Sequence, residues 1–428
     1  MGMKVLLIGG GGREHALAWK LRQSARVERL ICVPGNGGIS EDAECVGGDV
    51  KNVEALVRLA TEMQPDLTVV GPELPLTLGI VDEFTRRGLR IFGPTAAAAR
   101  LESSKSFAKE FMQRHHVPTA HYAVCTTLDE VHDALAHLSA PVVVKADGLA
   151  AGKGVVIART KDDAKETAQQ MLTGALVGEA GARVVLEEFL DGEEISFLVL
   201  SDGERVAPLV AARDHKRVGD NDTGPNTGGM GAYSSDELLD AGMRTWLINH
   251  VAQPVINGMA AEDTPYRGIL YCGLMMTASG PRVLEFNCRF GDPETQPILM
   301  RLESDLVDAV EAAIDGRVSE GVFRWSSDAA CCVVLASGGY PGTYDSGKLV
   351  TGLREASEVS GVKVFHAGTS HVDGSYYTAG GRVLGVTARA VDLPTAVEHA
   401  YKAVEKIRFD GMHYRKDIGW RAVARQGG

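Results

Sequence analysis

Two oxygen-bearing side chains stand at the end of an apolar run in the segment LEFNCRFGDPETQ, residues 284–296. Side chains of a strand alternate between its two faces, so Glu285 and Asn287 share a face and Arg289 follows on it. A carboxylate and an amide oxygen are hard ligands, suited to Mg²⁺ that nucleotide phosphates also hold. Arg289 is placed to bind a carboxylate or a phosphate. The segment predicts phosphoryl chemistry, and the alternative is a buried strand that ends in a polar turn with a surface ion pair.

A second segment, PVVVKADGLAAGKGV at 141–155, puts Lys145 at the end of a buried strand and then forms a glycine-rich loop. The positive charge of Lys145 would lie close to the protein interior, and binding to a phosphate would explain that position. Gly148, Gly152 and Gly154 leave backbone N–H groups accessible to an anion. The loop is not a Walker A motif, because no GK[ST] appears. The alternative is a hairpin with a solvated lysine.

The long loop RDHKRVGDNDTGPNTGGMGAY at 213–233 combines a basic cluster with acids and glycines. Long loops in compact domains tend to be functional or disordered, and this charge pattern favours anion binding. The acidic run EEFLDGEE at 187–194 follows a strand. A strand that passes between subdomains can offer its backbone to an adenine edge and a carboxylate to ribose hydroxyls, although an acidic turn is the commoner structure.

The N-terminal run GGGGREH at 9–15 follows a strand and opens a helix. Backbone N–H groups and the helix dipole bind phosphate in that context. The dinucleotide fingerprint requires a third glycine where this chain has Glu14, so that pattern is not met. The monophosphate of a sugar fits the loop better than NAD.

Strands and helices alternate through the first hundred residues, which predicts a parallel, doubly wound sheet covered on both faces. Ligands bind beyond the carboxyl ends of such strands, here at 9–15, 34–38, 71–73 and 93–94. The predicted strands are 4–8, 29–33, 67–70 and 89–92, and the predicted helices are 13–24, 52–63 and 78–87.

Three further regions follow, so the predicted domains are 1–102, 103–190, 191–327 and 328–428. Predicted helices are 103–117, 128–138, 161–172, 246–261, 305–314 and 393–407, and predicted strands are 122–124, 142–145, 155–158, 184–189, 194–200, 205–208, 271–277, 282–286, 330–336, 362–367, 376–378 and 382–388. The fold class is therefore a multidomain combination of α/β and α+β, with a small mixed C-terminal domain.

Composition places further limits on function. The 428 residues are 45% hydrophobic and 23% charged, as in globular proteins, and the net charge of −12 argues against nonspecific nucleic-acid binding. The seven cysteines show no CxxC or zinc spacing, which indicates reduced thiols in the cytoplasm. The apolar start at 5–8 is too short for a signal peptide, and we expect neither a membrane span nor a membrane partner.

The runs at 9–15, 141–155, 213–233 and 284–296 together resemble the glycinamide ribonucleotide synthetase (phosphoribosylamine–glycine ligase) family of the ATP-grasp superfamily. The resemblance extends over all four regions, and the run at 213–233 matches that family rather than ATP-grasp proteins at large. It implies a two-part ATP-grasp core behind a pre-ATP-grasp domain, and no fused downstream enzyme. The implied reaction joins glycine to 5-phosphoribosylamine at the cost of ATP, with Mg²⁺ or Mn²⁺, in an enzyme expected to be a monomer.

The resemblance also assigns residues. The ATP positions are Lys105, Lys145, Gly152, Gly154, Glu187, Glu188, Phe189, Leu190, Glu194, Arg217 and Asn226, with adenine along 187–190 and ribose near Glu194. The substrate positions are Gly11, Gly12, Arg13, Asn36, Gly37, Asp214, Arg289, Asp292 and Pro293. The catalytic positions are Arg289, Asp214 and Lys145, and the metal positions are Glu285 and Asn287.

The resemblance further implies that the loop 149–155 closes over the reaction. His215 could act as a catalytic base, but the reaction needs mainly charge neutralisation, which favours a hydrogen-bonding role. The C-terminal turns also resemble the family's last domain, and we expect them to be tight turns with no catalytic role. Three other functions compete with this one. A carboxylase acting on a purine intermediate or on biotin shares the superfamily, but the run at 213–233 argues against it. A nicotinamide oxidoreductase leaves everything after residue 100 unexplained. A catalytically dead nucleotide-binding regulator leaves the complete set of candidate ligands unexplained.

Overall fold

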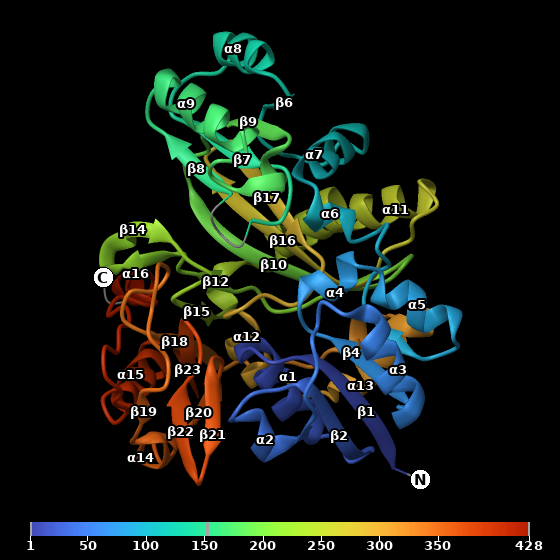
Figure 1. Ribbon diagram of the computed structural model, residues 1–428, viewed down its shortest axis with the longest axis vertical. Helices are drawn as coiled ribbons and strands as arrows, with labels where there is room; N and C mark the ends of the chain where they lie inside the picture. The colour runs from blue at the N-terminus through green and yellow to red at the C-terminus, as the bar shows by residue number, and fades with distance from the viewer. Residues whose placement is uncertain (1, 151–153, 427–428) are drawn as a thin grey trace.

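A five-stranded parallel sheet forms the N-terminal region of the computed structural model, which describes residues 2–150 and 154–426. Its order is β3-β2-β1-β4-β5, and the predicted doubly wound sheet is confirmed. The faces of β1 alternate: Leu6 and Ile8 pack toward α3 and α5, whereas Val5 and Leu7 pack toward α1 and α13 (Figure 1). The elements are β1 (Met3–Gly9), α1 (Gly12–Arg22), β2 (Val27–Pro34), α2 (Ile39–Asp42), β3 (Glu44–Cys45), α3 (Val53–Met63), β4 (Leu67–Val70), α4 (Glu73–Thr77), α5 (Ile80–Arg86), β5 (Ile91–Phe92), α12 (Thr295–Arg301) and α13 (Leu306–Ile314).

A four-stranded antiparallel sheet follows, in the order β6-β9-β7-β8, and we call it the small sheet. Helices α8 and α9 cover it, and each begins with a capping box, Thr127 with Glu130 and Thr160 with Asp163. The elements are α6 (Arg100–Ser103), α7 (Lys105–Arg114), β6 (Tyr122–Cys125), α8 (Leu128–His137), β7 (Val142–Ala146), β8 (Val155–Ala158), α9 (Lys161–Leu172), the 3₁₀ helix η1 (Gly178–Gly181) and β9 (Val184–Glu188).

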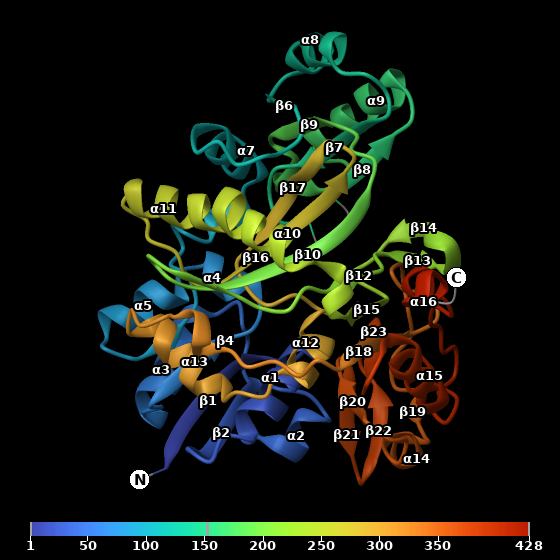
Figure 2. The same cartoon turned by 180° about the vertical axis from the view of Figure 1, so that it is seen from behind.

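A second antiparallel sheet, the long sheet, has the order β11-β10-β16-β17. Both views place it below the small sheet, with α11 beside it (Figure 2). The backbone N–H of Val283 on β17 donates to the carbonyl of Pro118, which ties the two sheets' regions together. The elements are β10 (Glu193–Asp202), β11 (Val206–Pro208), the 3₁₀ helix η3 (Asp236–Leu238), α10 (Ala241–Leu247), the π-helix η4 (Ile248–Ala252), α11 (Gln253–Ala261), β16 (Arg267–Thr277), β17 (Gly280–Asn287) and the 3₁₀ helix η5 (Glu320–Val322).

The C-terminal sheet has the order β12-β15-β18-β23-β20, so two of its strands come from the long loop that precedes residue 327. That loop also forms the hairpin β13–β14, and both views show α16 beside this hairpin. The elements are β12 (Arg213–Asp214), β13 (Arg217–Gly219), the 3₁₀ helix η2 (Asp220–Asp222), β14 (Thr223–Asn226), β15 (Gly231–Ser234), β18 (Ala329–Ala336), β19 (Leu349–Val350), α14 (Leu353–Ser357), β20 (Val362–His366), β21 (Thr369–Val372), β22 (Ser375–Thr378), β23 (Arg382–Ala390), α15 (Leu393–Val404) and α16 (Trp420–Gln426).

Three predicted helices differ from the structure for local reasons. Gly79 has φ +84°, so the helix predicted at 78–87 begins only at Ile80. Ser104 has an extended backbone and caps α7. The helix predicted at 103–117 therefore begins at Lys105, and Ser103 belongs to the separate helix α6. Pro254 lies in the first turn of α11 and lacks an N–H, and the helix predicted at 246–261 passes through a π-turn just before it. Within 2–150 and 154–426, no helix is long and apolar enough to cross a membrane.

Candidate functional site

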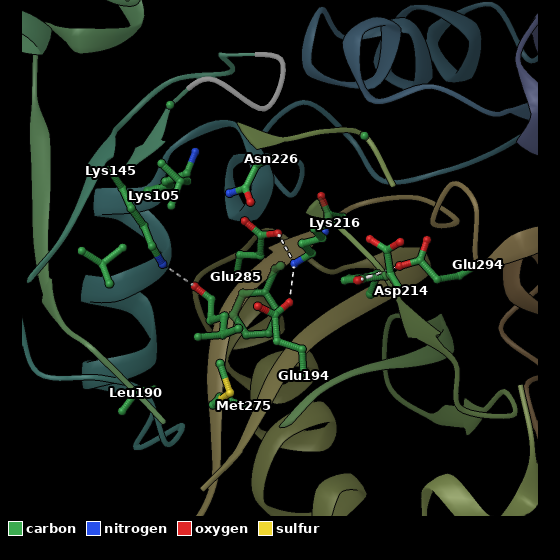
Figure 3. A pocket seen from close by; sticks show the side chains of 18 of the residues that line it. Lys105, Lys145, Leu190, Glu194, Asp214, Lys216, Asn226, Met275, Glu285 and Glu294 are labelled. Carbon is green, nitrogen blue, oxygen red and sulfur yellow. Dashed lines mark hydrogen bonds and ion pairs between the residues drawn. The ribbon is translucent and has the colours of Figure 1, made fainter. Parts of the chain in front are cut away.

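A cavity of about 550 Å³ brings together most of the predicted ATP, metal and catalytic residues. Its walls come from the small sheet, the long sheet, the long loop and the C-terminal segment 419–421, and Figure 3 shows part of the lining. The predicted residues that line it are Lys105, Lys145, Gly154, Glu187, Glu188, Phe189, Leu190, Glu194, Asp214, Arg217, Asn226, Glu285, Asn287, Arg289 and Asp292. Gly152 lies outside the described residues, as does the middle of the loop 149–155.

Two lysines reach the cavity from different elements. Lys105 is the first residue of α7, and Asp147 fixes that helix end by accepting from the N–H of Ser106 at 2.7 Å. Burial lowers the pKa of Lys105, with Glu285 opposing the shift. Lys145, buried on β7, donates to the carbonyl of Leu284 on β17 at 3.1 Å. The two lysines therefore enter the same cavity from α7 and from the small sheet.

The predicted metal carboxylate, Glu285, sits among cations. Burial alone would raise its pKa, but Lys216, Lys145 and Lys105 hold the pKa below its usual value. Lys216 lies 2.8 Å from Glu194 and 3.9 Å from Glu285. Although burial opposes it, the pair of carboxylates raises the pKa of Lys216 well above its usual range. Glu285 is therefore ionised before any metal arrives, as a Mg²⁺ ligand must be.

The donor set suits a hard cation that arrives with a nucleotide. Glu285 and Asn287 both line the cavity from the end of β17 with the buried Phe286 between them, and a shift in the β16–β17 register at Leu284 breaks the alternation just before Glu285. Within the described ranges, no group of three His, Cys, Asp or Glu side chains could hold a metal. Mg²⁺ commonly takes one or two protein oxygens and completes its shell with phosphates and water. Two protein oxygens fit that pattern and do not form a complete metal cage.

Arg289, the predicted anion clamp, lies between two carboxylates. It is 3.2 Å from Glu73 at the start of α4 and 3.1 Å from Glu102 on α6. Burial would raise the pKa of Glu73, but Arg289 and Arg13 lower it to about 2. Burial raises the pKa of Glu102 despite the arginine. The guanidinium is thus paired on both sides. The sequence did not predict either pairing, because Glu73 and Glu102 lie far from Arg289 in the chain.

A second cluster of acids lines the same cavity. Glu294, which sequence reasoning also missed, accepts from the hydroxyl groups of Ser196 at 3.0 Å and Tyr271 at 2.9 Å. Burial, followed by the charge of Glu294, raises the pKa of Asp214 well above its usual range. The Oδ1 atom of Asp214 is buried and has no hydrogen-bond partner among the residues described. An unpartnered carboxylate beside a second acid is suited to a cationic ligand.

The long loop is held over the cavity by the C-terminal region. In the hairpin β13–β14, Arg217 pairs with Asn226, and Arg217 donates to the carbonyl of Gly224 at 2.7 Å. Arg415, fully buried, donates to the carbonyl of Arg217 at 3.1 Å and to Asp222 at 2.9 Å. The C-terminal region therefore contributes to the site.

One C-terminal turn, expected to be structural, also reaches site residues. Arg382 donates to the Asp292 carboxylate at 2.7 Å and to the carbonyl of Gly228. Pro293 follows Asp292, and its ring lies so close to Gly229 that a Cβ there would clash with it. The substrate candidates Asp292 and Pro293 thus lie where the long loop meets the C-terminal sheet.

The remaining substrate candidates, in the N-terminal loops, do not line this cavity. The N–H of Gly11, expected to face a phosphate, donates instead to Glu14 at 2.6 Å. The side-chain amide of Asn36 donates to the carbonyls of Gly10, His366 and Ala367. These bonds join the N-terminal and C-terminal regions.

Three more of these candidates also make contacts within the protein. Arg13 donates to Glu14 at 2.6 Å, the N–H of Gly37 donates to the carbonyl of Thr369, and a Cβ on Gly12 would meet Gln296. Their assignment to phosphoribosylamine stays a prediction.

Comparisons with known proteins agree with this geometry. Three families match in succession: the phosphoribosylglycinamide synthetase N domain at 3–102, its ATP-grasp (A) domain at 103–295 and its C domain at 330–421. A phosphoribosylamine–glycine ligase of Pseudomonas aeruginosa is 53% identical over the full length of both chains. One from Vibrio parahaemolyticus is 51% identical over 99% of each chain.

Solved structures show the same architecture. The phosphoribosylamine–glycine ligase of Thermotoga maritima superimposes with a TM-score of 0.85 at 33% identity, over 97% of this chain and 100% of that one. Biotin carboxylase of Campylobacter jejuni, at 16% identity and a TM-score of 0.75 over 96% of this chain and 93% of that one, shares the fold. The predicted multidomain fold with an ATP-grasp core is confirmed.

Proposed function

Because this chain belongs to the phosphoribosylglycinamide synthetase family, we propose that it uses ATP to join glycine to 5-phosphoribosylamine. The products are glycinamide ribonucleotide, ADP and phosphate, a step of purine synthesis. One observation carries the proposal: two lysines, a carboxylate and an amide oxygen at the end of β17, an arginine and an unpartnered acid share one cavity. We further propose that a monomer performs the reaction without a nucleic-acid or membrane partner.

The nucleotide is proposed to lie between the small and long sheets. An apolar part of the lining, formed by Val143, Ile157, Leu190, Met275 and Leu284, offers flat contact area to adenine. The strand segment 187–190 borders it and can supply backbone groups to the base edge. Lysines 105 and 145, which line the same cavity, are proposed to meet the phosphates.

Glu285 and Asn287 are the residues proposed to hold Mg²⁺ or Mn²⁺. When bound, such an ion neutralises phosphate charge and polarises the transferred group. Glu285 is prepared for this by Lys216, which keeps its carboxylate ionised.

Glycine is proposed to bind with its ammonium group at Asp214 and Glu294 and its carboxylate toward Arg289. Both acids and the arginine line the same cavity, and the unpartnered Oδ1 of Asp214 gains a donor when an ammonium group arrives. The Glu73 and Glu102 carboxylates, at 3.2 Å and 3.1 Å, hold the guanidinium in position. The amine substrate then approaches from the side of Asp292 and Pro293.

The chemistry follows from the poor reactivity of a carboxylate, whose charge repels nucleophiles. An oxygen of the glycine carboxylate attacks the γ-phosphorus, the bond to the β-phosphate oxygen breaks, and ADP leaves with glycyl phosphate formed. The amine of phosphoribosylamine attacks the acyl carbon, the bond from that carbon to the phosphate oxygen breaks, and the amine loses a proton. The protein contributes positioning and charge stabilisation at each step.

ADP release from ATP with Mg²⁺ tests the proposal. The assay contains glycine, with or without phosphoribosylamine generated in situ, and parallel reactions replace glycine with bicarbonate or alanine. We expect release that requires both glycine and the amine. Release that depends on bicarbonate would favour the carboxylase alternative, and an absence of release with every acid would favour the regulator.

A further inference from the structure

Lys109 is a buried cation next to the nucleotide site that the proposed reaction leaves without a role. It lies on α7, one turn after Lys105, and its side chain is 2% exposed. Its Nζ is 2.8 Å from Oε2 of Glu187. The other oxygen of that carboxylate, Oε1, is 2.8 Å from Nζ of Lys145. One buried carboxylate therefore lies between two ammonium groups.

The net charge of this triad depends on Lys109. Lys145 and Glu187 alone form a neutral ion pair, which offers little attraction to a phosphate. Lys109 supplies a second positive charge, so the triad as a whole is +1. Burial lowers the pKa of Lys109 to about 8, opposed by Glu187, so the ammonium form persists at neutral pH.

Lys109 also fixes the geometry of the triad. Its Nζ donates to Oγ1 of Thr119 at 2.7 Å, and that hydroxyl donates to the carbonyl of Val283 at 2.6 Å. Lys145 donates to the next carbonyl, that of Leu284. The triad is thus bonded to β17 at two successive carbonyls just before Glu285, which links α7 and the small sheet to the candidate metal strand.

We infer that Lys109 is a positioning residue for nucleotide binding, which neutralises Glu187 so that Lys145 keeps its positive charge for phosphate. The inference rests on the proposed function only in requiring a nucleotide polyphosphate in the cavity. A purely structural cross-link between α7 and β9 would predict equal effects on every part of the nucleotide. The charge role predicts an effect confined to the phosphates.

The test compares the dissociation constants of ADP and adenosine, measured by calorimetry or competition, in the full-length protein. K109M makes the triad neutral, and we expect the ADP-to-adenosine affinity ratio to fall on the order of tenfold. K109M/E187Q returns the charge to +1 and should restore the ratio to within about threefold. E187Q alone, at +2, should raise the ratio, which keeps the test available if K109M does not fold.

Two controls separate charge from packing. K109R keeps the charge and should keep the ratio. K161M removes a lysine whose ammonium group binds the carbonyl of Leu135 and which does not line the cavity, so it should change neither affinity. An equal loss of ADP and adenosine affinity in K109M, or no recovery in the double variant, would overturn the inference.

A wrong substrate assignment would leave these binding measurements unchanged, because they contain neither glycine nor amine. If the wild-type protein bound no ADP at all, the nucleotide site itself would be refuted, and the role of Lys109 with it.

Discussion

The ammonium group of Lys216 lies 3.9 Å from the carboxylate of Glu285, so a cation from the long loop neighbours the candidate metal ligand. Lys216 also lies 2.8 Å from Glu194, which is the residue assigned to the ribose. One side chain therefore connects the candidate metal and ribose positions, as Figure 3 shows.

Glu285→Gln should lose most Mg²⁺-dependent turnover, at least about a hundredfold, and keep its fold. The amide is a weaker metal ligand than the carboxylate it replaces. The measurement is the turnover number across a Mg²⁺ titration at saturating ATP, with circular dichroism as the fold check. Glu54→Gln on α3, an exposed acid paired with Arg58, serves as the control. Wild-type turnover at equal Mg²⁺ would remove Glu285 from the metal site.

Asp214→Asn should raise the KM for glycine about a hundredfold and change the KM for ATP little, because the amide cannot pair with an ammonium group. The raised pKa of Asp214 adds a pH signature. In the wild-type enzyme, kcat/KM for glycine should fall as pH drops and the carboxylate protonates, and the variant should lack that fall. Asp162→Asn on the exposed start of α9 is the control. Parallel losses for glycine and ATP would contradict the ammonium assignment.

Arg415→Met should raise the KM for ATP about tenfold, since the hairpin with Arg217 and Asn226 loses its buried anchor. Arg354 on α14 offers a control in the same region: its ion pair with Glu358 at 3.6 Å is exposed, and it does not line the cavity. Surface ion pairs contribute little, so Arg354→Met should stay within about threefold of the wild type. Steady-state kinetics on both variants measures the difference, and equal effects would show that burial of Arg415 is irrelevant.

His366 should make the junction between the N-terminal and C-terminal regions sensitive to acid. Burial, then the neighbouring His15, lowers its pKa to about 3. The unfolded chain, with an ordinary pKa near 6.5, binds more protons between those values, so stability is full above about pH 6.5 and falls as pH drops toward 3. Between pH 6.5 and 5 the loss is about 2 kcal/mol.

Urea unfolding at several pH values measures that loss. His366→Gln should flatten the dependence, even if its stability at neutral pH is lower. The exposed His132 gives the control substitution His132→Gln, which should keep the wild-type slope. An unchanged slope in His366→Gln would assign the acid sensitivity to other groups.

Local patterns were enough to place the residues of β17 and β7. Alternation along a strand is a property of the backbone, so Glu285 and Asn287 share a face and Lys145 stands at a buried strand end. The same holds for the doubly wound sheet, whose strands read as continuous apolar runs. The strand β3 was not predicted, because its two residues, Glu44 and Cys45, are both exposed and form no apolar run.

Pairings between distant segments were decided by tertiary structure alone. Arg289 meets Glu73, Lys109 and Lys145 share Glu187, and the C-terminal Arg415 holds the long loop. Backbone geometry sets the spacing of side chains within one strand or helix, so the sequence alone predicts which of them share a face. The distance between side chains on separate elements depends on how whole layers pack, which requires every element to be placed at once. The sequence therefore determined which groups could do the chemistry, and packing decided which partners hold them and which charges remain for the ligand.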